Sequence, residues 1–349
     1  MNKKRKLTIA VSGLNAIDSP GPGIAVIRGL KEAQSFDCRI IGLAYESLEP
    51  GIFMHDLVDK TYQIPYPSSG TESIMERLEY IHEKEKLDVI IPNFDAELYP
   101  FIRLEKRMKE MGIASFLPTM KQFEERLKVN LDEFGKTYGI RVPKGKVYHD
   151  LASLQSLGKD FQYPVLVKGK YYDAYIAYNI DQVKSYFHKI TAKWGTPVVL
   201  QEFVHGTEFN VTGLGDGEGN TIAAVPMRKQ YITDKGKAWG GVSISDRKIL
   251  ELTRSFISQT KWRGAFELEL MKDKHNDFYL LEINPRMPAW IYLAVGVGQN
   301  IPEALVKLAL GEKPLTFSEY KTGKMFVRYS WDMIVDIEEF QQISTHGEL

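Results

Sequence analysis

Short apolar runs alternate with amphipathic stretches through the first third of the chain. The runs Leu7–Val11, Cys38–Leu43 and Asp88–Ile91 are typical of buried strands, and the stretches that begin near Gly23 and cover Ser73–Glu83 have the spacing of helices. Strands that alternate with helices favour a parallel sheet covered by helices. The first part of the chain is therefore predicted to be an open parallel α/β domain.

After Pro118 the pattern changes to short strands and hairpins. We expect helices at Thr119–Lys128, Asn130–Tyr138, Asp150–Leu157, Asp181–Ile190, Asp246–Thr260 and Asn300–Leu310, and strands at Tyr163–Lys168, Tyr171–Asn179, Thr196–Val204, Phe209–Leu214 and Asn220–Met227. The glycine-rich stretch Arg228–Ser243 has the composition of a mobile lid. The fold class predicted is α/β followed by α+β, with domains at 1–118, 119–195 and 196–349.

Two runs near the end of the chain carry acids at alternate positions. In FYLLEINPR the side chains of Glu282 and Asn284 share one face, and in GAFELEL the side chains of Glu267 and Glu269 do the same. A short polar connector predicts that the two runs pair as a hairpin. Oxygen ligands on paired strands suit Mg²⁺. For Glu267 taken alone, a solvated face is the favoured explanation.

For Glu282 and Asn284 the functional interpretation is favoured, because both lie in an otherwise apolar run where an unpaired charge is costly. Arg286 follows them and could neutralise charge on a transferring phosphoryl group. Lys168 ends another apolar strand, where a solvent-reaching lysine competes with a phosphate contact. The sequence leaves that choice open.

Composition restricts the classes of partner. The 349 residues carry 45 basic and 45 acidic side chains, so bulk charge predicts neither a nucleic-acid nor a membrane partner. A single cysteine, Cys38, excludes an internal disulfide, and no apolar run approaches the length of a membrane span. The basic start, Lys3–Lys6, is interpreted as a solvated strand end, and a cytoplasmic protein is expected.

Two further candidates are weaker. Gly13, Gly21 and Gly23 could suggest a dinucleotide fingerprint, but their spacing is wrong for one. Asp95 and Glu97 follow a strand at the edge where open sheets bind ligands, which makes them candidates for an acceptor site. Acids at a helix N-terminus are the favoured explanation.

The order of these features along the chain resembles a known family. Lys128, the segment PVLVK ending at Lys168, the segment QEFV-x-G-x-E from Gln201 to Glu208, the acid at Glu269 and the segment EINPR follow one another within residues 119–312. In this the chain resembles the ATP-grasp superfamily, nearest to its biotin carboxylase and carbamoyl-phosphate synthetase branch. The resemblance implies a two-subdomain ATP-grasp fold preceded by an α/β domain.

The resemblance also implies roles, cofactors and a reaction. ATP and Mg²⁺, with Mn²⁺ as an alternative ion, would be used to join a small-molecule carboxylate and an amine through an acyl-phosphate, and a homodimer would be one possible assembly. The implied roles are phosphate binding for Lys128 and Lys168, adenine contact for Gln201, Glu202 and Val204, ribose contact for Glu208, metal ligation for Glu269, Glu282 and Asn284, and stabilisation of the acyl-phosphate for Arg286, with Lys168 also catalytic. Glu267 is assigned a supporting place behind the metal ligands.

One segment departs from the family pattern, and two rival functions stay open. The stretch Gly169–Tyr175 has one glycine where the family has a glycine-rich phosphate loop, so the phosphate clamp could instead use Lys170 and the 228–241 stretch. The rivals are a bicarbonate-phosphorylating subunit and a nucleotide-binding protein without catalysis. Met287, Trp290 and Tyr292 could line an acceptor pocket, although core packing is the commoner use of such residues.

Overall fold

The computed structural model describes residues 4–17, 19–170, 173–233, 236–330 and 332–349. The chain divides into two compact units. The first contains residues 1–120, 210–267 and 284–349, and the second contains residues 121–209 and 268–283. The division into three domains at residues 118 and 195 stays a prediction.

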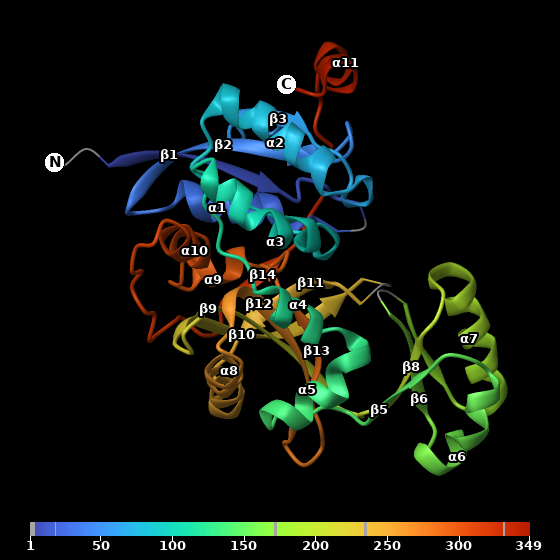
Figure 1. Cartoon of the computed structure of the whole chain (residues 1–349). Helices are drawn as coiled ribbons and strands as arrows, with labels where there is room; N and C mark the ends of the chain where they lie inside the picture. The colour runs from blue at the N-terminus through green and yellow to red at the C-terminus, as the bar shows by residue number, and fades with distance from the viewer. Residues whose placement is uncertain (1–3, 18, 171–172, 234–235, 331) are drawn as a thin grey trace. The chain divides into compact units, whose positions relative to one another are not determined.

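The N-terminal part of the first unit is an open parallel sheet, as the sequence predicted. Its strands are β1 (Arg5–Ser12), β2 (Phe36–Ala44), β3 (Lys60–Gln63) and β4 (Val89–Ile91), in the order β3-β2-β1-β4. Helices α1 (Pro22–Lys31), α2 (Thr71–Glu85) and α3 (Asp95–Glu110) cover it (Figure 1). In the register, Ile9 lies opposite Ile40 on β2 and Val89 on β4, and all three are fully buried. This apolar centre explains why the three sequence runs predicted strands correctly.

The chain then contributes a six-stranded sheet with the order β13-β12-β9-β10-β11-β14. Its strands are β9 (Thr207–Asp216), β10 (Thr221–Ile232), β11 (Ala238–Ser243), β12 (Arg263–Lys272), β13 (Phe278–Asn284) and β14 (Met325–Val327). The accompanying helices in the first unit are α8 (Arg247–Thr260), α9 (Tyr292–Gly296), α10 (Ile301–Ala309) and α11 (Ile337–His346). The predicted pairing of the two acid-bearing strands is confirmed, because β12 and β13 are neighbours in this sheet.

The stretch Arg228–Ser243, predicted from its glycines to be a loop with the composition of a mobile lid, is mostly strand, and a role as a lid stays a prediction. These residues form most of an antiparallel hairpin, in which Arg228 pairs with Val242 and Met227 pairs with Ser243, with shifts of register between Lys229 and Ile232. The glycines that suggested a loop instead allow close packing, since a Cβ on Gly241 would collide with the sulfur of Met227. Only the connection between Ile232 and Ala238 lies outside the strands, and Lys235 in it is not among the described residues.

The second unit contains an antiparallel sheet with the order β5-β8-β6-β7. The strands are β5 (Gly145–Tyr148), β6 (Val165–Gly169), β7 (Ala174–Ala177) and β8 (Val198–Glu202), and the helices are α4 (Met120–Glu125), α5 (Leu131–Tyr138), α6 (Leu157–Asp160) and α7 (Ile180–Trp194). In Figure 1, α7 runs along this sheet, and its buried Phe187 joins the core formed by Val165, Val167 and Leu200. The strand expected at Tyr171–Asn179 is shorter, and Tyr171 and Tyr172 lie outside the described residues.

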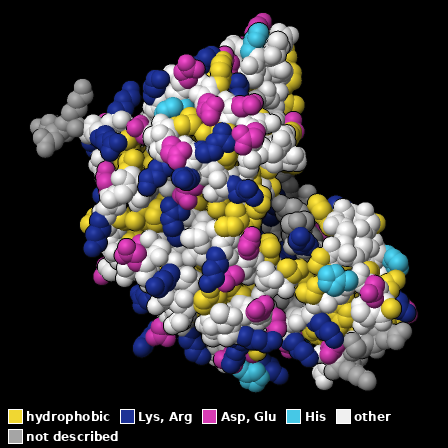
Figure 2. Space-filling view, viewed as in Figure 1, with side chains coloured by type: hydrophobic (Ala, Val, Ile, Leu, Met, Phe, Trp, Pro, Cys, Tyr) yellow, Lys and Arg dark blue, Asp and Glu magenta, His cyan; other side chains and the backbone are white. Residues whose placement is uncertain are grey.

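Two properties of the whole chain bear on its partners. Basic and acidic side chains are interspersed over the face drawn in Figure 2, in keeping with the balanced composition. Among the described residues, the helices all lack the length or the apolar character needed to cross a membrane.

Candidate functional site

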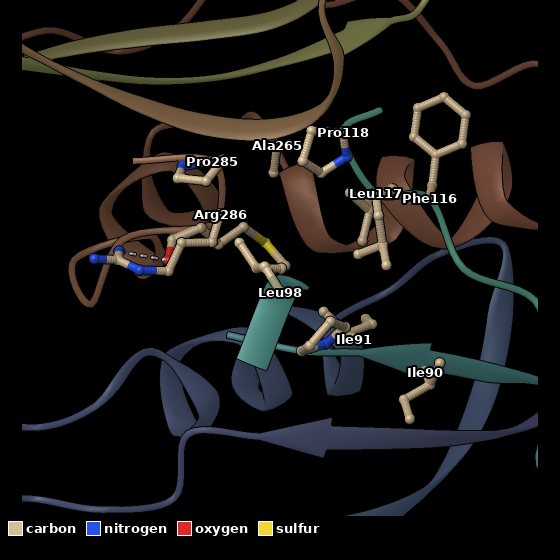
Figure 3. Close-up of a pocket in the computed structure, with 12 residues that line it drawn as sticks. Ile90, Ile91, Leu98, Phe116, Leu117, Pro118, Ala265, Pro285 and Arg286 are labelled. Atoms are coloured by element: carbon tan, nitrogen blue, oxygen red, sulfur yellow. Dashed lines mark hydrogen bonds between the residues drawn. The ribbon is translucent and has the colours of Figure 1, made fainter. Parts of the chain in front are cut away.

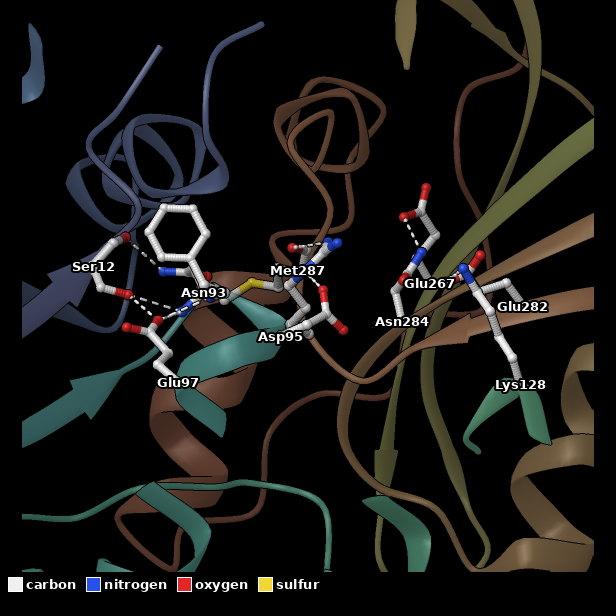
Figure 4. A network of polar contacts seen from close by, with 11 residues as sticks. Ser12, Asn93, Asp95, Glu97, Lys128, Glu267, Glu282, Asn284 and Met287 are labelled. Atoms are coloured by element: carbon white, nitrogen blue, oxygen red, sulfur yellow. Dashed lines mark hydrogen bonds and ion pairs between the residues drawn. The ribbon is translucent and has the colours of Figure 1, made fainter. Parts of the chain in front are cut away.

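The second unit brings together two lysines and three carboxylates from separate segments. Lys168 lies on β6 and is only 8% exposed, and it interacts electrostatically with Lys128, Glu282, Glu269 and Glu208. The Nζ atom of Lys128, in the 3₁₀ turn Lys128–Asn130, lies 3.3 Å from Oε1 of Glu282 (Figure 4). Residues that are up to 154 positions apart in the sequence thus share one charged cluster.

Lys168 is the most unusual member of this cluster. Burial, with a smaller contribution from the neighbouring charge of Lys128, lowers the pKa of its ammonium group from 10.5 to about 8. Within the described parts of the chain, the ammonium group of Lys168 makes no hydrogen bond and no ion pair closer than 4 Å. A buried ammonium group without hydrogen-bond acceptors is costly, so this position is suited to an anionic ligand that supplies oxygens.

The residues predicted for the nucleotide base and ribose follow one another along β8 and β9. Gln201 is 3% exposed, and its Oε1 is buried without a hydrogen-bond donor in the described structure. Glu202 is exposed, Val204 is half-buried in the connection to β9, and Glu208 is half-buried on β9. Only glycine fits at position 206 in this connection, because a Cβ there would collide with the carbonyl of Lys272 on β12.

The predicted metal ligands lie on β12 and β13. Glu269 and Glu282 are half-buried, and Asn284 is 7% exposed at the end of β13, two residues after Glu282 on the same face. Among the described residues, no group of three or more His, Cys, Asp or Glu side chains is arranged to hold a metal ion. A metal at these strands would therefore also depend on the Asn284 amide and on oxygens from a ligand, as Mg²⁺ commonly does.

Glu267, the residue assigned a supporting place, is buried in the first unit. Its carboxylate is 6% exposed and accepts hydrogen bonds from Nδ2 of Asn210 (2.7 Å), Nδ2 of Asn284 (3.0 Å) and Nε1 of Trp290 (2.6 Å). Trp290 is itself 5% exposed, so its ring belongs to the core. The solvated-face alternative for Glu267 is wrong, because three donors from separate segments surround the carboxylate.

Arg286 contacts helix α3, which packs on the parallel sheet. Its Nε donates to Oδ2 of Asp95 at 2.7 Å, and its Nη1 donates to the carbonyl of Met287 at 3.3 Å. Asp95 is the first residue of α3, where a carboxylate also interacts favourably with the helix dipole. Asp95 therefore holds a guanidinium group and begins a helix at the same time.

Glu97 is fully buried two residues further along α3. It accepts hydrogen bonds from the hydroxyls of Ser12 and Tyr45 and from the backbone of Phe94, and burial raises the pKa of its carboxyl group. These donors join the carboxyl ends of β1, β2 and β4. The contacts of Glu97 are those of a residue that ties the strand ends together.

The residues suggested for an acceptor pocket are mostly packed. Met287 is 2% exposed and lines a small, mostly apolar pocket together with Ile91, Leu98 and Leu117 (Figure 3). Arg286 supplies its charged wall, but its guanidinium group is directed to Asp95 and the Met287 carbonyl. Tyr292 contacts Glu32 and lies under the guanidinium of Arg28. These contacts fit core and surface packing.

Sequence reasoning missed Arg328, which follows β14. Burial lowers the pKa of its guanidinium group, and the charge of Glu267 opposes that change. Its only side-chain hydrogen bond within the described structure is a long one, 3.5 Å, to the carbonyl of Pro20. A lone arginine just after a short edge strand carries no motif, so only the fold could reveal that it lies near Glu267.

The structure is thus a mixed α/β fold in which two lysines and three carboxylates form one charged cluster. Residues 195–330 match the family model described as "ATP-grasp in the biosynthetic pathway with Ter operon". The chain therefore contains an ATP-grasp domain, and the resemblance found in the sequence is confirmed.

Relatives and solved structures agree with this family. The carbamoyl phosphate synthase large chain of Clostridium botulinum (strain Kyoto / Type A2) is 25% identical over 274 residues, which are 74% of this chain and 24% of the relative. The chain thus spans about a quarter of that relative's length.

Two solved structures show the fold. The biotin carboxylase domain of Hydrogenobacter thermophilus 2-oxoglutarate carboxylase, solved with MgADP, ADP and bicarbonate, has a TM-score of 0.69 at 18% identity and covers 93% of this chain and 74% of its own. An L-amino acid ligase from Bacillus licheniformis has a TM-score of 0.64 at 16% identity, covering 89% and 75%. The predicted fold class is confirmed by these matches.

Proposed function

We propose that this protein is an ATP-dependent ligase that joins a carboxylate to an amine through an acyl-phosphate. The observation that carries the proposal is Lys168, a buried ammonium group that has Lys128 beside it and no hydrogen-bond acceptor within the described structure. Phosphate oxygens would supply the missing acceptors and would stabilise the charged form of the ammonium group. The function proposed is therefore one that begins with nucleotide binding.

A nucleotide and its metal fit the neighbouring residues. The buried Oε1 of Gln201 needs a donor, and the exocyclic amine of adenine is one. Glu208 is assigned to the ribose, and Glu202 and Val204 to the base, the last two partly through their backbone groups. Glu269, Glu282 and Asn284 offer the hard oxygen ligands that Mg²⁺ prefers. When bound, the metal would neutralise phosphoryl charge and so permit attack by a carboxylate.

Arg286 is assigned to the charge that develops on the acyl-phosphate. Its Nε is held by Asp95 and its Nη1 by the carbonyl of Met287, and these two contacts fix the plane of the guanidinium group. A guanidinium group that is fixed in advance stabilises such charge without reorganisation. Arg286 and Lys168 are thus the proposed catalytic residues. The second substrate, an amine, would then displace phosphate to give an amide.

A bicarbonate-phosphorylating activity is the second candidate. It is favoured by the solved neighbour that carries bicarbonate beside MgADP and by the carbamoyl phosphate synthase relative. A protein that binds nucleotide without turning it over is the third. Retention of Lys128, Lys168 and Glu282 in one cluster supports catalysis over simple binding, since a binding protein does not need the complete charge set.

One experiment separates the two catalytic candidates. Purified protein with MgATP is screened for ADP release in the presence of pooled amino acids and small carboxylates, and in a parallel arm with bicarbonate alone, with product masses measured in both. A carboxylate–amine ligase releases ADP only with both organic substrates. ADP release with bicarbonate alone would instead establish the second candidate.

Variants test the site itself. We expect Lys168→Ala and Glu282→Gln to abolish ADP release. Lys136 is an exposed lysine paired with Asp132, and Lys136→Ala should leave ADP release unchanged. Unchanged turnover in either site variant would refute the assignment of these residues. Absence of a melting response to MgATP in the wild type would refute the proposed function as a whole.

A further inference from the structure

A buried carboxylate holds three side chains that belong to different segments of the first unit. Glu267 on β12 accepts hydrogen bonds from Asn210 on β9, from Asn284 at the end of β13 and from Trp290 in the segment that follows Arg286. All four residues are at most 7% exposed, and the contact between Glu267 and Asn284 is drawn in Figure 4.

Stability alone does not explain an acid at this position. Taking a carboxylate out of water costs several kcal/mol, and a well-packed apolar side chain generally serves a core at least as well. Three N–H donors surround the carboxylate of Glu267, and the guanidinium of Arg328 interacts with it electrostatically. A function that needs a hydrogen-bond acceptor at this point would explain why a carboxylate is buried here.

The contact with Asn284 fixes the orientation of an amide. A carboxylate can only accept hydrogen bonds, so the amide group of Asn284 must turn its Nδ2 towards Glu267. Because the amide is planar, its carbonyl oxygen, Oδ1, is then directed away from Glu267. An amide without this partner could rotate by half a turn and present its NH₂ group instead.

We propose that Glu267 is a positioning residue, which holds the amide of Asn284 so that its oxygen faces the metal ion bound with the nucleotide. The proposal rests on the assignment of Asn284 as a metal ligand under the proposed function. Mg²⁺ takes oxygen ligands and cannot take a protonated amide nitrogen, so the orientation of this one side chain decides whether it binds the metal. Supporting residues of this kind tune affinity through the ligands they orient.

Glu267→Gln tests the orientation with almost no change in volume. The new amide can donate to Oδ1 of Asn284, which lets Asn284 turn its NH₂ group to the metal. We expect the affinity for Mn²⁺ at saturating ADP, measured by electron paramagnetic resonance, to fall on the order of tenfold to hundredfold. The affinity for metal-free ADP, measured by calorimetry, should not change.

Glu105→Gln is the matched control. Glu105 is a partly buried carboxylate of the same unit that is paired with Arg263 at 2.8 Å, so the variant also removes a charged partner inside the fold. It should change neither affinity. A fall in metal affinity of equal size in both variants, or in metal-free ADP affinity in Glu267→Gln, would refute a positioning role in favour of general destabilisation.

An exchanged pair gives the decisive result. In Glu267→Gln with Asn284→Asp, the hydrogen bond is kept with donor and acceptor reversed, and the carboxylate introduced at position 284 presents an oxygen to the metal in either orientation. We expect this pair to regain most of the Mn²⁺ affinity lost in Glu267→Gln, and the pair also decides the matter if the single variant does not fold. A folded pair without metal binding, or wild-type metal affinity in Glu267→Gln, overturns the inference. A wild type without metal-dependent nucleotide binding overturns the proposed function first.

Discussion

Replacing Lys168 by Met should stabilise the protein while removing its nucleotide site. The aliphatic part of the lysine packs on β6 inside the sheet of the second unit, and Met preserves that packing without the ammonium group. What the substitution removes is a buried charge without hydrogen-bond acceptors in the described structure. A side chain retained at the expense of stability is expected where function requires it.

The magnitude follows from the pKa of Lys168. Burial lowers that pKa from 10.5 to about 8, and each unit corresponds to about 1.4 kcal/mol, so the charge costs about 3 kcal/mol at pH 7. The unfolded chain binds this proton more tightly than the folded chain. The cost is therefore complete below pH 8 and disappears as the pH rises to 10.5, leaving about 1.4 kcal/mol at pH 9.5.

Urea unfolding at pH 7 and pH 9.5 measures both values. We expect the free energy of unfolding of Lys168→Met to exceed that of the wild type by up to about 3 kcal/mol at pH 7 and by roughly half of that at pH 9.5. The exposed Lys136→Met should show no such pH-dependent difference. The wild type alone should gain stability on addition of MgATP. The reasoning fails if Lys168→Met is less stable than the wild type at pH 7, or if its advantage does not depend on pH.

Three further changes test other charges of the first unit. Glu49 is buried, with Oε2 lacking a hydrogen-bond partner in the described structure, and burial raises the pKa of its carboxyl group from 4.5 to about 6. Its charge therefore lowers stability above pH 6 and not below pH 4.5. Glu49→Gln should raise the free energy of unfolding in urea by about 2 kcal/mol at pH 8 but not at pH 4, and the exposed Glu83→Gln should show no such gain. Arg286→Ala should lower turnover roughly 10² to 10³-fold in the ADP-release assay, with little change in MgATP affinity. Asp95→Asn should lower turnover about tenfold to a hundredfold by loosening the guanidinium group, and wild-type turnover would contradict the role given to that contact.

The sequence predicted most of the fold because its strongest signals are local. The β-branched and apolar runs that became β1, β2 and β4 are buried on both faces of a parallel sheet, so burial and sequence pattern agree. The expected helix Asn130–Tyr138 ends where α5 does, and Gly139 follows it in the left-handed conformation. Where local composition and pairing conflict, the sequence misleads: Gly240 and Gly241 suggested a loop but lie in β11.

The candidate site was less predictable, because its geometry depends on contacts between distant segments. The order of Lys128, Lys168 and Glu282 along the chain indicated a shared task, but only the fold brings the three charges into one cluster. The pairing of Arg286 with Asp95 joins residues 191 positions apart, and the position of Arg328 near Glu267 has no local signal at all. Contacts of this kind are set by sheet order, which periodicity does not specify.

The two most buried charges of the candidate machinery differ in a way that separates their tasks. Glu267 is surrounded by three donors, so it has little capacity left for a ligand and acts through the side chains it holds. The side chain of Lys168 is about as buried, but its ammonium group makes no hydrogen bond within the described structure. All three of its N–H donors are therefore available to a ligand. A buried charge whose hydrogen bonds are complete fixes the side chains around it, whereas one without hydrogen bonds can bind a ligand. Glu267 is therefore expected to act on metal affinity through Asn284, and Lys168 is expected to contact the nucleotide directly.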